Sequence, residues 1–235
     1  MGLCRILLSF VVAILCSISA VSAGRGEKVQ VALYYESLCP YSAKFIVNYL
    51  SKIFDNGLID VVDLDLVPYG NARIKSNGTI ICQHGRYECL LNTIEACAIH
   101  AWPDLAEHFK FILCVEGLVL KHKYLNWESC FRETGLKSEA VSNCYESGYG
   151  EKLELQYAAQ TDALIPPHKY VPWVVVNGQP LYDDYENLEI YICAACKGVS
   201  PKACEGLTVL TTISKEPIRV NHVSHVDETF ESVEI

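Results

Sequence analysis

Residues 29–67 have the sequence VQVALYYESLCPYSAKFIVNYLSKIFDNGLIDVVDLDLV, and they decide the fold. The β-rich run at 29–35 suits a buried central strand. Apolar residues then recur three and four apart from Phe45 to Ile53, which predicts a helix that Asp55-Asn56-Gly57 ends. Residues 59–67 predict a second strand. A strand, a helix and a strand within about forty residues form a βαβ unit with parallel pairing.

The β signal returns late in the chain. Residues 170–176, Tyr-Val-Pro-Trp-Val-Val-Val, are followed by Asn177-Gly178 and then by residues 179–182. Asn-Gly between two β-rich runs predicts a hairpin with a type I′ turn. Residues 186–196 predict a last helix.

The middle of the chain, residues 82–164, is helical in pattern and carries most of the cysteines. Helices are predicted at 88–106, 105–120 and 151–162. The fold class is therefore α/β, a thioredoxin-like fold with an inserted cysteine-rich helical subdomain. The expected segments are a first thioredoxin-like part at 24–81, the insertion at 82–164, a second thioredoxin-like part at 165–204, and an extended or disordered tail at 205–235.

The first 23 residues predict a secretory signal peptide. Arg5 precedes a short apolar run, and small residues end at Val21-Ser22-Ala23. An uncleaved membrane anchor is the alternative, which the shortness of the apolar run disfavours. No later stretch is long and apolar enough to span a bilayer. We expect a soluble protein of the secretory pathway with no stable membrane association after the signal is cleaved.

Charge and cysteine content narrow the class further. The formal net charge is −9 and no basic run is present, so nucleic acid is not an expected partner. Twelve cysteines, two of them within the signal (Cys4 and Cys16), indicate a disulfide-bearing protein from an oxidising route. Asn77-Gly78-Thr79 is an acceptor triplet, and we expect Asn77 to carry a glycan.

Cys39 is the candidate nucleophile. It follows a buried strand and precedes a helix, with Pro40 at the first helical position. A sulfur at a helix N-terminus meets unpaired N–H groups and the positive end of the dipole, which stabilise the thiolate that attacks disulfides. Position alone leaves a reactive and a structural role for Cys39 equally open.

Ser42 stands one turn after Cys39, where a dithiol reductase has its second cysteine. Its hydroxyl is placed to donate a hydrogen bond to the Cys39 sulfur. Serine cannot displace a client from a mixed disulfide, so this position changes the expected mechanism.

Val171-Pro172 supports a reactive Cys39. A proline at the start of a strand removes a ladder donor and therefore needs a reason. In thioredoxin-like folds a cis proline at this point lies against the reactive sulfur. We expect Pro172 to be cis and close to Cys39, with the backbone of Val171 open to a substrate strand.

Residues 82–97, Cys-Gln-His-Gly-Arg-Tyr-Glu-Cys-Leu-Leu-Asn-Thr-Ile-Glu-Ala-Cys, match the pattern C-Q-H-G-x2-E-C-x2-N-x4-C. That signature is similar to the one carried by gamma-interferon-inducible lysosomal thiol reductases, and residues 161–178 also resemble this family. The resemblance implies a soluble enzyme that reduces protein disulfides, often in acidic lysosome-like compartments, and is made as a glycosylated precursor. The family's nucleophile falls on Cys39 and its partner cysteine on Ser42.

The resemblance also implies a structural set of eight cysteines: Cys82, Cys89, Cys97, Cys114, Cys130, Cys144, Cys193 and Cys204. Their connectivity stays open, except that Cys193 with Cys204 is the favoured pair across a Gly/Ser/Pro turn. Cys196 falls outside the set and is mainly structural in our interpretation, with a distant resolving thiol as the alternative. A zinc site from Cys82, His84, Cys89, Cys97 and His100 is disfavoured, because the spacing fits no common zinc pattern. No metal is expected, and His84 is expected to order a loop.

Three functions follow. The first is a thiol-disulfide oxidoreductase in which Cys39 attacks the disulfides of client proteins. Such an enzyme needs no cofactor and depends on an external thiol such as glutathione or cysteine. The second is a non-catalytic relative that keeps the fold and holds clients. The third, a lipid-binding helical module, is disfavoured by the strands at both ends. The expected location is the cell exterior, the lysosome or the vacuole.

Overall fold

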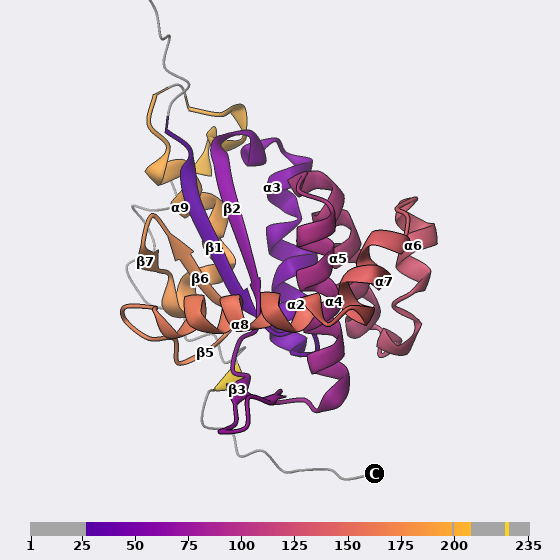
Figure 1. Cartoon of the computed structure of the whole chain (residues 1–235). Coiled ribbons are helices and arrows are strands. Elements are labelled where there is room, and N and C mark those ends of the chain that lie inside the picture. The colour runs from indigo at the N-terminus through magenta and orange to yellow at the C-terminus, as the bar shows by residue number, and fades with distance from the viewer. Residues whose placement is uncertain (1–26, 199, 208–223, 226–235) are drawn as a thin grey trace, which may run out of the picture.

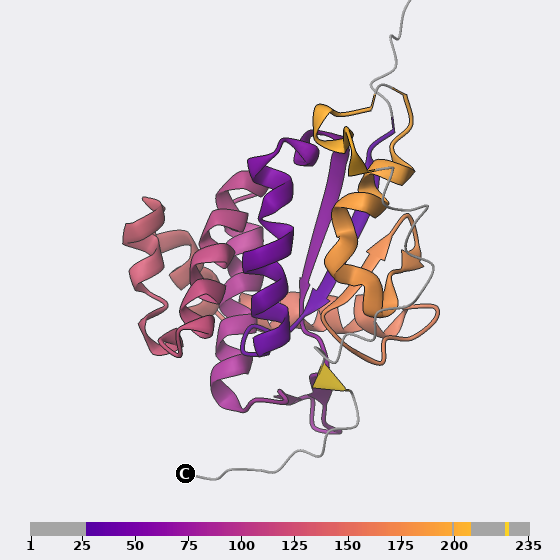
Figure 2. The ribbon, with the colours of Figure 1, turned by 180° about the vertical axis from the view of Figure 1, so that it is seen from behind.

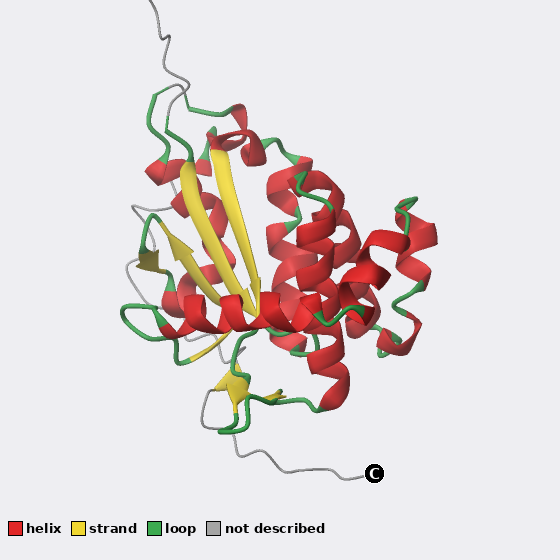
Figure 3. Ribbon diagram, viewed as in Figure 1, coloured by secondary structure: helices red, strands yellow, loops and turns green. Residues whose placement is uncertain are grey.

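The fold is built on a four-stranded sheet with the order β2-β1-β6-β7. The computed structural model describes residues 27–198, 200–207 and 224–225. β1 (Val29–Tyr35) is central: it pairs parallel with β2 (Val62–Pro68) and antiparallel with β6 (Trp173–Val176). Figure 1 shows the sheet beside a group of helices, and Figure 3 separates the two by colour. The parallel pair is the predicted βαβ unit.

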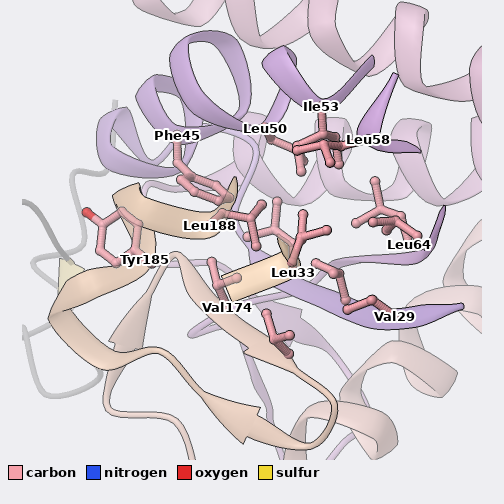
Figure 4. Close-up of a cluster of buried hydrophobic side chains, with 14 of the residues drawn as sticks. Val29, Leu33, Phe45, Leu50, Ile53, Leu58, Leu64, Val174, Tyr185 and Leu188 are labelled. Atoms are coloured by element: carbon pink, nitrogen blue, oxygen red, sulfur yellow. The ribbon is translucent and has the colours of Figure 1, made fainter. Parts of the chain in front are cut away.

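Alternate residues of β1 face two different cores, as the two-residue period of a strand requires. Val29, Val31, Leu33 and Tyr35 join the larger cluster of buried side chains. Figure 4 shows that cluster, with Leu33 and Val174 of the sheet facing Phe45 and Leu188 of the helices. Tyr34 points to the other face and packs with Val67 and Trp173. Both faces of the sheet are therefore covered.

Helices from both ends of the chain cover the first face. α2 (Pro40–Phe45), a π-helical turn (Ile46–Leu50) and α3 (Lys52–Asp55) follow β1 directly. Gly57, at φ 80°, ends this helical run before a 3-10 turn at Leu58–Val61. α9 (Leu188–Ala195) lies beside it on the same side, as Figure 2 shows. α8 (Tyr149–Asp162) crosses the opposite face.

The middle segment forms α4 (Arg86–Ala101), α5 (Leu105–Leu120), a 3-10 turn (Tyr124–Asn126), α6 (Ser129–Thr134), α7 (Glu139–Glu146) and α8. These helices have a core of their own around Phe111, Val115 and Leu153. α5 nevertheless also contributes Phe109 and Ile112 to the core of the sheet. The helical insertion therefore shares its packing with the thioredoxin-like part.

Several boundaries differ from the sequence prediction. The helix expected at 88–106 ends at Ala101, because Pro103 follows and Asp104 begins α5 by accepting a hydrogen bond from the Ala106 N–H at 2.8 Å. α6 and α7 were not predicted, since each is too short for a clear period. The strand expected at 59–67 begins at Val62, after the 3-10 turn.

The late hairpin has the predicted turn. Asn177 and Gly178 both have positive φ, 48° and 78°, as a type I′ turn needs, and β7 (Gln179–Pro180) follows. The stretch expected as one strand at 170–176 is divided by Pro172 into β5 (Tyr170–Val171) and β6. A 3-10 turn (Tyr182–Asn187) then precedes α9, which is shorter than the predicted 186–196 helix.

The two ends of the chain are described only in part. The predicted signal peptide, 1–23, lies outside the described residues, and so does most of the predicted tail. The 3-10 turn Lys202–Cys204 comes just before that tail, and within the tail β8 (Ser224–His225) pairs antiparallel with β5. Within the described residues, no helix has the length and apolar character that crossing a bilayer requires.

Four disulfides join the eight expected cysteines: Cys82–Cys89, Cys97–Cys144, Cys114–Cys130 and Cys193–Cys204. Asn77 is exposed in the turn between β3 (Arg73–Ile74) and β4 (Ile80–Ile81), as a glycan acceptor must be. The glycan itself stays a prediction.

The contact between α8 and α4 is tight at Gly150. A Cβ on Gly150 would lie 2.4 Å from Thr93 Cγ2 and 2.9 Å from Cys97 Sγ. We expect Gly150→Ala to lower the free energy of unfolding by about 1–3 kcal/mol, because the added methyl overpacks this contact. Denaturant unfolding measures the change. Gly117→Ala on α5 is the matched control: it meets no atom within 4 Å and should raise stability slightly. Equal effects of the two substitutions would contradict this packing.

Candidate active site around Cys39

Cys39 ends the loop between β1 and α2 and is the N-cap residue of α2. Its N–H donates to the Glu36 carbonyl at 3.2 Å, and its carbonyl accepts from the Ala43 N–H at 3.0 Å. Pro40 is the first helical residue, as predicted. Cys39 takes part in none of the four disulfides, and its side chain is fully buried. A thiol held in this place has the helix-terminal environment that favours thiolate.

The Val171–Pro172 peptide bond is cis. Pro172 immediately precedes Trp173, and Trp173 forms the last residue pair of the β1–β6 ladder with Tyr34. β1 leads from Tyr34 through Tyr35 into the Cys39 loop. Neighbouring strands therefore bring Pro172 and Cys39 to the same end of the sheet. The cis bond is confirmed, whereas the contact between Pro172 and the sulfur stays a prediction.

The backbone of Val171 is not open in this structure. Val171 pairs with Ser224, and Tyr170 pairs with His225, so β8 occupies the edge that was expected to receive a substrate strand. The expectation of an open edge is wrong for this state of the chain, because a segment of the tail lies on it.

Ser42 lies one turn after Cys39 and is fully buried. Its Oγ has no hydrogen-bond partner among the described residues, so the expected hydrogen bond to the sulfur is absent there.

The family-like signature holds the loop that carries Cys39. The Ser37 N–H donates to Asn92 Oδ1 at 2.9 Å, and the Ser37 hydroxyl donates to the Glu88 carbonyl at 3.2 Å. Both acceptors belong to α4. Glu36, on the same loop, accepts from the Asn71 N–H at 2.7 Å, and Asn71 donates in turn to Gln83 at 2.8 Å. The Cys82–Cys89 disulfide ties the segment before α4 to its first turn.

His84 joins this arrangement as an ion-pair partner. Its Nδ1 lies 2.5 Å from Glu88 Oε2 and 3.4 Å from Glu36 Oε2, and both carboxyls are fully buried. Burial disfavours the imidazolium, but hydrogen bonds and charges from the two carboxyls outweigh it and raise the pKa of His84 to about 10. Burial and the Glu88 charge raise the pKa of Glu36 to about 7. His84 thus orders the loop, as expected.

Glu36, His84 and Glu88 are also the described cluster whose ligand atoms lie close enough to hold a metal ion. At 2.5 Å, however, the Nδ1–Oε2 contact is a direct hydrogen bond that leaves no room for an ion between the two atoms. The disfavoured zinc interpretation fails for another reason. Cys82, Cys89 and Cys97 are all in disulfides and offer no thiolate.

Cys196 lies far from Cys39. It follows α9, and its neighbour Lys197 pairs with Glu27, just before the start of β1, at 3.0 Å. Cys39 follows the other end of β1. Seven residues of strand span about 23 Å, so Cys196 is not in reach to resolve a disulfide on Cys39. The alternative of a distant resolving thiol is not supported by this geometry.

A layer of buried acids behind Cys39 was not predicted. Glu88, Glu95, Glu116 and Glu154 are buried with Tyr35, whose hydroxyl donates to Glu95 Oε2 at 2.6 Å. Burial raises the pKa of Glu95 to about 8 and raises the pKa of Glu116 and of Glu154 well above the usual value. One signal was present in the sequence: Glu88, Asn92 and Glu95 recur on one face of the predicted helix.

Tyr185 is a second residue that the sequence did not mark. It lies in the 3-10 turn before α9, is buried, and interacts electrostatically with Cys39. Burial, followed by the charge of Glu186, raises its pKa. Tyr185 is therefore a neutral hydroxyl near the sulfur.

Comparison with known proteins agrees with this site. The sequence profile described as gamma interferon inducible lysosomal thiol reductase matches residues 30–134. The chain is 45% identical to the gamma-interferon-responsive lysosomal thiol protein of Arabidopsis thaliana over 202 residues, 84% of this chain and 83% of that protein. It is 42% identical to the gamma-interferon-inducible lysosomal thiol reductase of Carassius auratus, covering 75% of this chain and 72% of that one.

Solved structures support the fold. The oxidised DsbA of Mycobacterium tuberculosis aligns with a TM-score of 0.54 at 18% identity, over 81% of this chain and 93% of that one. The reduced disulfide bond oxidoreductase DsbG of the same organism aligns with a TM-score of 0.52 at 18% identity, over 78% and 85%. At this identity the likeness concerns the fold alone. It agrees with the thioredoxin-like architecture expected from residues 29–67.

The buried acids predict an unusual pH dependence of stability. Between pH 6.5 and 8 the unfolded chain has lost these carboxyl protons, whereas Glu36 and Glu95 lose theirs in the folded chain only near 7 and 8. The folded state then binds more protons, so the free energy of unfolding should fall as pH rises through this window, by up to about 1.4 kcal/mol per pH unit for each such group.

Urea unfolding at several pH values measures this slope. His84, whose pKa is raised to about 10 in the folded chain, adds to the same fall, whereas His108 and His168, whose pKa values burial lowers, act in the opposite direction below pH 6.5. Glu95→Gln should flatten the slope, and Glu107→Gln, on the exposed side of α5, should leave it unchanged. A stability that rises from pH 6.5 to 8 would contradict the protonated state of these acids.

Proposed function

Because this chain belongs to the gamma interferon inducible lysosomal thiol reductase family, we propose that Cys39 is its nucleophile and that it works without a second active-site cysteine. The family makes the chain a thiol-disulfide oxidoreductase with disulfide reductase activity. The proposal concerns the residues that act and their order. The observation that carries it is the place of Cys39, at the start of α2 and at the same end of the sheet as Pro172.

The first step is exchange between Cys39 and a client disulfide. The Cys39 thiolate attacks one client sulfur, a new S–S bond forms, the client S–S bond breaks, and the second client sulfur leaves as a thiolate that takes a proton from solvent. Cys39 is now oxidised into a mixed disulfide, and one client sulfur is reduced.

Release requires external thiols. One thiolate attacks the Cys39 sulfur and expels the remaining client sulfur, which is then protonated. A second thiolate attacks the resulting Cys39 adduct and regenerates the Cys39 thiolate. In sum, one client disulfide and two thiols give a client dithiol and one small disulfide. A thiol of the glutathione or cysteine type meets this need, and no other cofactor enters the balance.

Two observations favour this external route. Ser42 stands where an internal thiol would act, and Cys196 lies about one strand length away. The mixed disulfide therefore waits for a bimolecular partner. The same feature gives the second candidate function, a client-holding relative whose adduct persists, and turnover in the presence of free thiol separates the two.

The clients we propose are disulfide-bonded proteins that the chain meets in the secretory pathway, at the cell exterior, or in the lysosome or vacuole. Four disulfides among the described residues fit an oxidising route of synthesis. Two relatives whose names contain the word lysosomal support the lysosome or vacuole as the place of action.

We further propose that clients bind along β5 after β8 has left it. Cys39 is fully buried, so a client must first gain access to the sulfur. β8 is two residues long and covers Val171, the residue before the cis bond. An incoming client strand would replace it with equivalent backbone hydrogen bonds, by addition to the same edge.

Ser42→Cys tests the mechanism. Wild type should form long-lived adducts linked through Cys39, and its turnover should rise with external thiol. Ser42→Cys should shorten the adduct lifetime and weaken that dependence, at least about tenfold, because an internal thiol acts at high effective concentration. Gel analysis of trapped adducts and reduction of a disulfide client measure the two effects.

Cys39→Ser is the matched control and should abolish both adducts and turnover. Rapid client release by wild type without added thiol would contradict external resolution. Full activity of Cys39→Ser would show that another residue is the nucleophile.

Removal of the tail tests the client edge. A chain that ends at Leu207 lacks β8, and its Cys39 should react with iodoacetamide roughly tenfold faster, because a two-residue pairing is worth about 1–2 kcal/mol. Peptide mass spectrometry measures the rate. A chain that ends at Val226 keeps Ser224 and His225 and should react like the full chain. Equal rates for all three chains would contradict access through β5.

A further inference from the structure

Glu95 of α4 and Glu116 of α5 form a pair of acids in the interior. Both side chains are fully buried. Glu95 Oε2 accepts from the Tyr35 hydroxyl, but Glu95 Oε1 and both Glu116 oxygens have no partner as long as both acids are ionised, because carboxylates only accept. The two side chains form a hydrogen bond with each other once one of them carries a proton. The geometry therefore requires a shared proton.

Burial is the main reason why the pair stays protonated. It raises the pKa of Glu95 to about 8, and it raises the pKa of Glu116 well above the usual value, with the Glu95 charge adding to the effect. Two buried carboxyls within hydrogen-bond distance of each other cannot both be ionised. The pair is uncharged in acid and gains negative charge only as pH rises.

Glu116 connects this pair to Cys39. α5 packs against α2, and the Glu116 carboxyl and the Cys39 sulfur interact electrostatically. The other titratable groups around the pair are Tyr35 of β1, Glu88 of α4, and Glu154 and Tyr157 of α8. His84, the nearby cation, contacts Glu36 and Glu88 instead of the pair. Among the described residues, no ion pair cancels a charge on Glu116.

We propose that the Glu95–Glu116 pair controls the ionisation of Cys39: the sulfur becomes a thiolate readily while the pair is uncharged, and a carboxylate charge on Glu116 opposes it. This rests on the proposed role of Cys39 as the nucleophile. The two acids are positioning residues that act through Cys39.

The pair also bears on the exchange itself. Attack moves the negative charge from Cys39 to the departing client sulfur, which is then protonated from solvent. While the Glu95–Glu116 pair is uncharged, no negative charge on the pair repels the negative charge on Cys39 or on the departing client sulfur. A purely structural contact would not need acids here, because an apolar pair fills a buried site at lower cost than oxygens without partners.

The test is the pH profile of Cys39 alkylation in the full-length chain. Cys196→Ser serves as the background, and mass spectrometry of the peptide that contains Cys39 reads iodoacetamide labelling of that thiol alone. Glu116→Gln keeps the shape of the side chain and removes its charge. We expect the midpoint of its profile to move to lower pH by about one unit or more relative to the background, since a like charge that acts through a buried interior opposes ionisation of the thiol.

Three further variants make the result decisive. Glu95→Gln with Glu116→Gln should shift the midpoint at least as far and leave a single titration step. Glu116→Met, an apolar replacement of similar length, should give the same shift and serves if the Gln variant fails to fold. Glu107→Gln, on the exposed side of α5, should keep the background profile.

An unchanged midpoint in both Glu116 variants, or an equal shift in Glu107→Gln, would overturn the proposal. The readout is alkylation and needs no turnover. A chain that alkylates as expected but reduces no client would contradict the proposed function alone, whereas a chain that reduces clients with unshifted Glu116 variants would contradict the role of the pair alone.

Discussion

The site depends on the docking of the end of β1 onto α4. Ser37 binds Asn92 and Glu88, and Tyr35 binds Glu95, all in the buried interior. These contacts join an element of the sheet to an element of the insertion. Since the loop they hold ends in Cys39, the position of the sulfur is set by α4 as much as by the strand that precedes it. The shared core on α5 makes the same connection through apolar packing.

This docking explains why the signature has polar residues at fixed spacing. Gln83, His84, Glu88 and Asn92 each contact the Cys39 loop or a residue that contacts it. Gly85 begins α4 at φ 86°, a conformation that favours glycine. None of these side chains needs to touch a client. They fix the loop, while Cys39 and the strand edge at Val171 are left for chemistry.

The sequence was sufficient for the framework of the fold and for the centre of the site. β-rich runs located β1 and, with Asn177-Gly178 between them, the late hairpin, and helical spacing located the helix after Cys39. The Cys-Pro and Val-Pro pairs located the reactive end of the sheet. Contacts between distant segments were not predictable in the same way. The acid pair joins two helices whose relative rotation no local pattern fixes, and β8 lies in a tail without periodicity. Ser42 shows how little a single residue type predicts about its contacts. Its identity excluded a second thiol, but it did not reveal that the hydroxyl has no hydrogen-bond partner among the described residues.

The enzyme is held together by the same kind of bond that it breaks. Cys82–Cys89 ties the signature segment that fixes the Cys39 loop, and one of its two cysteines, Cys89, is only partly buried. Thiols that regenerate Cys39 therefore also meet a structural disulfide next to the site. Reduction of Cys82–Cys89 would loosen the segment that positions the nucleophile, so the thiols that the reaction consumes also set an upper limit to the reducing strength in which the site keeps its shape.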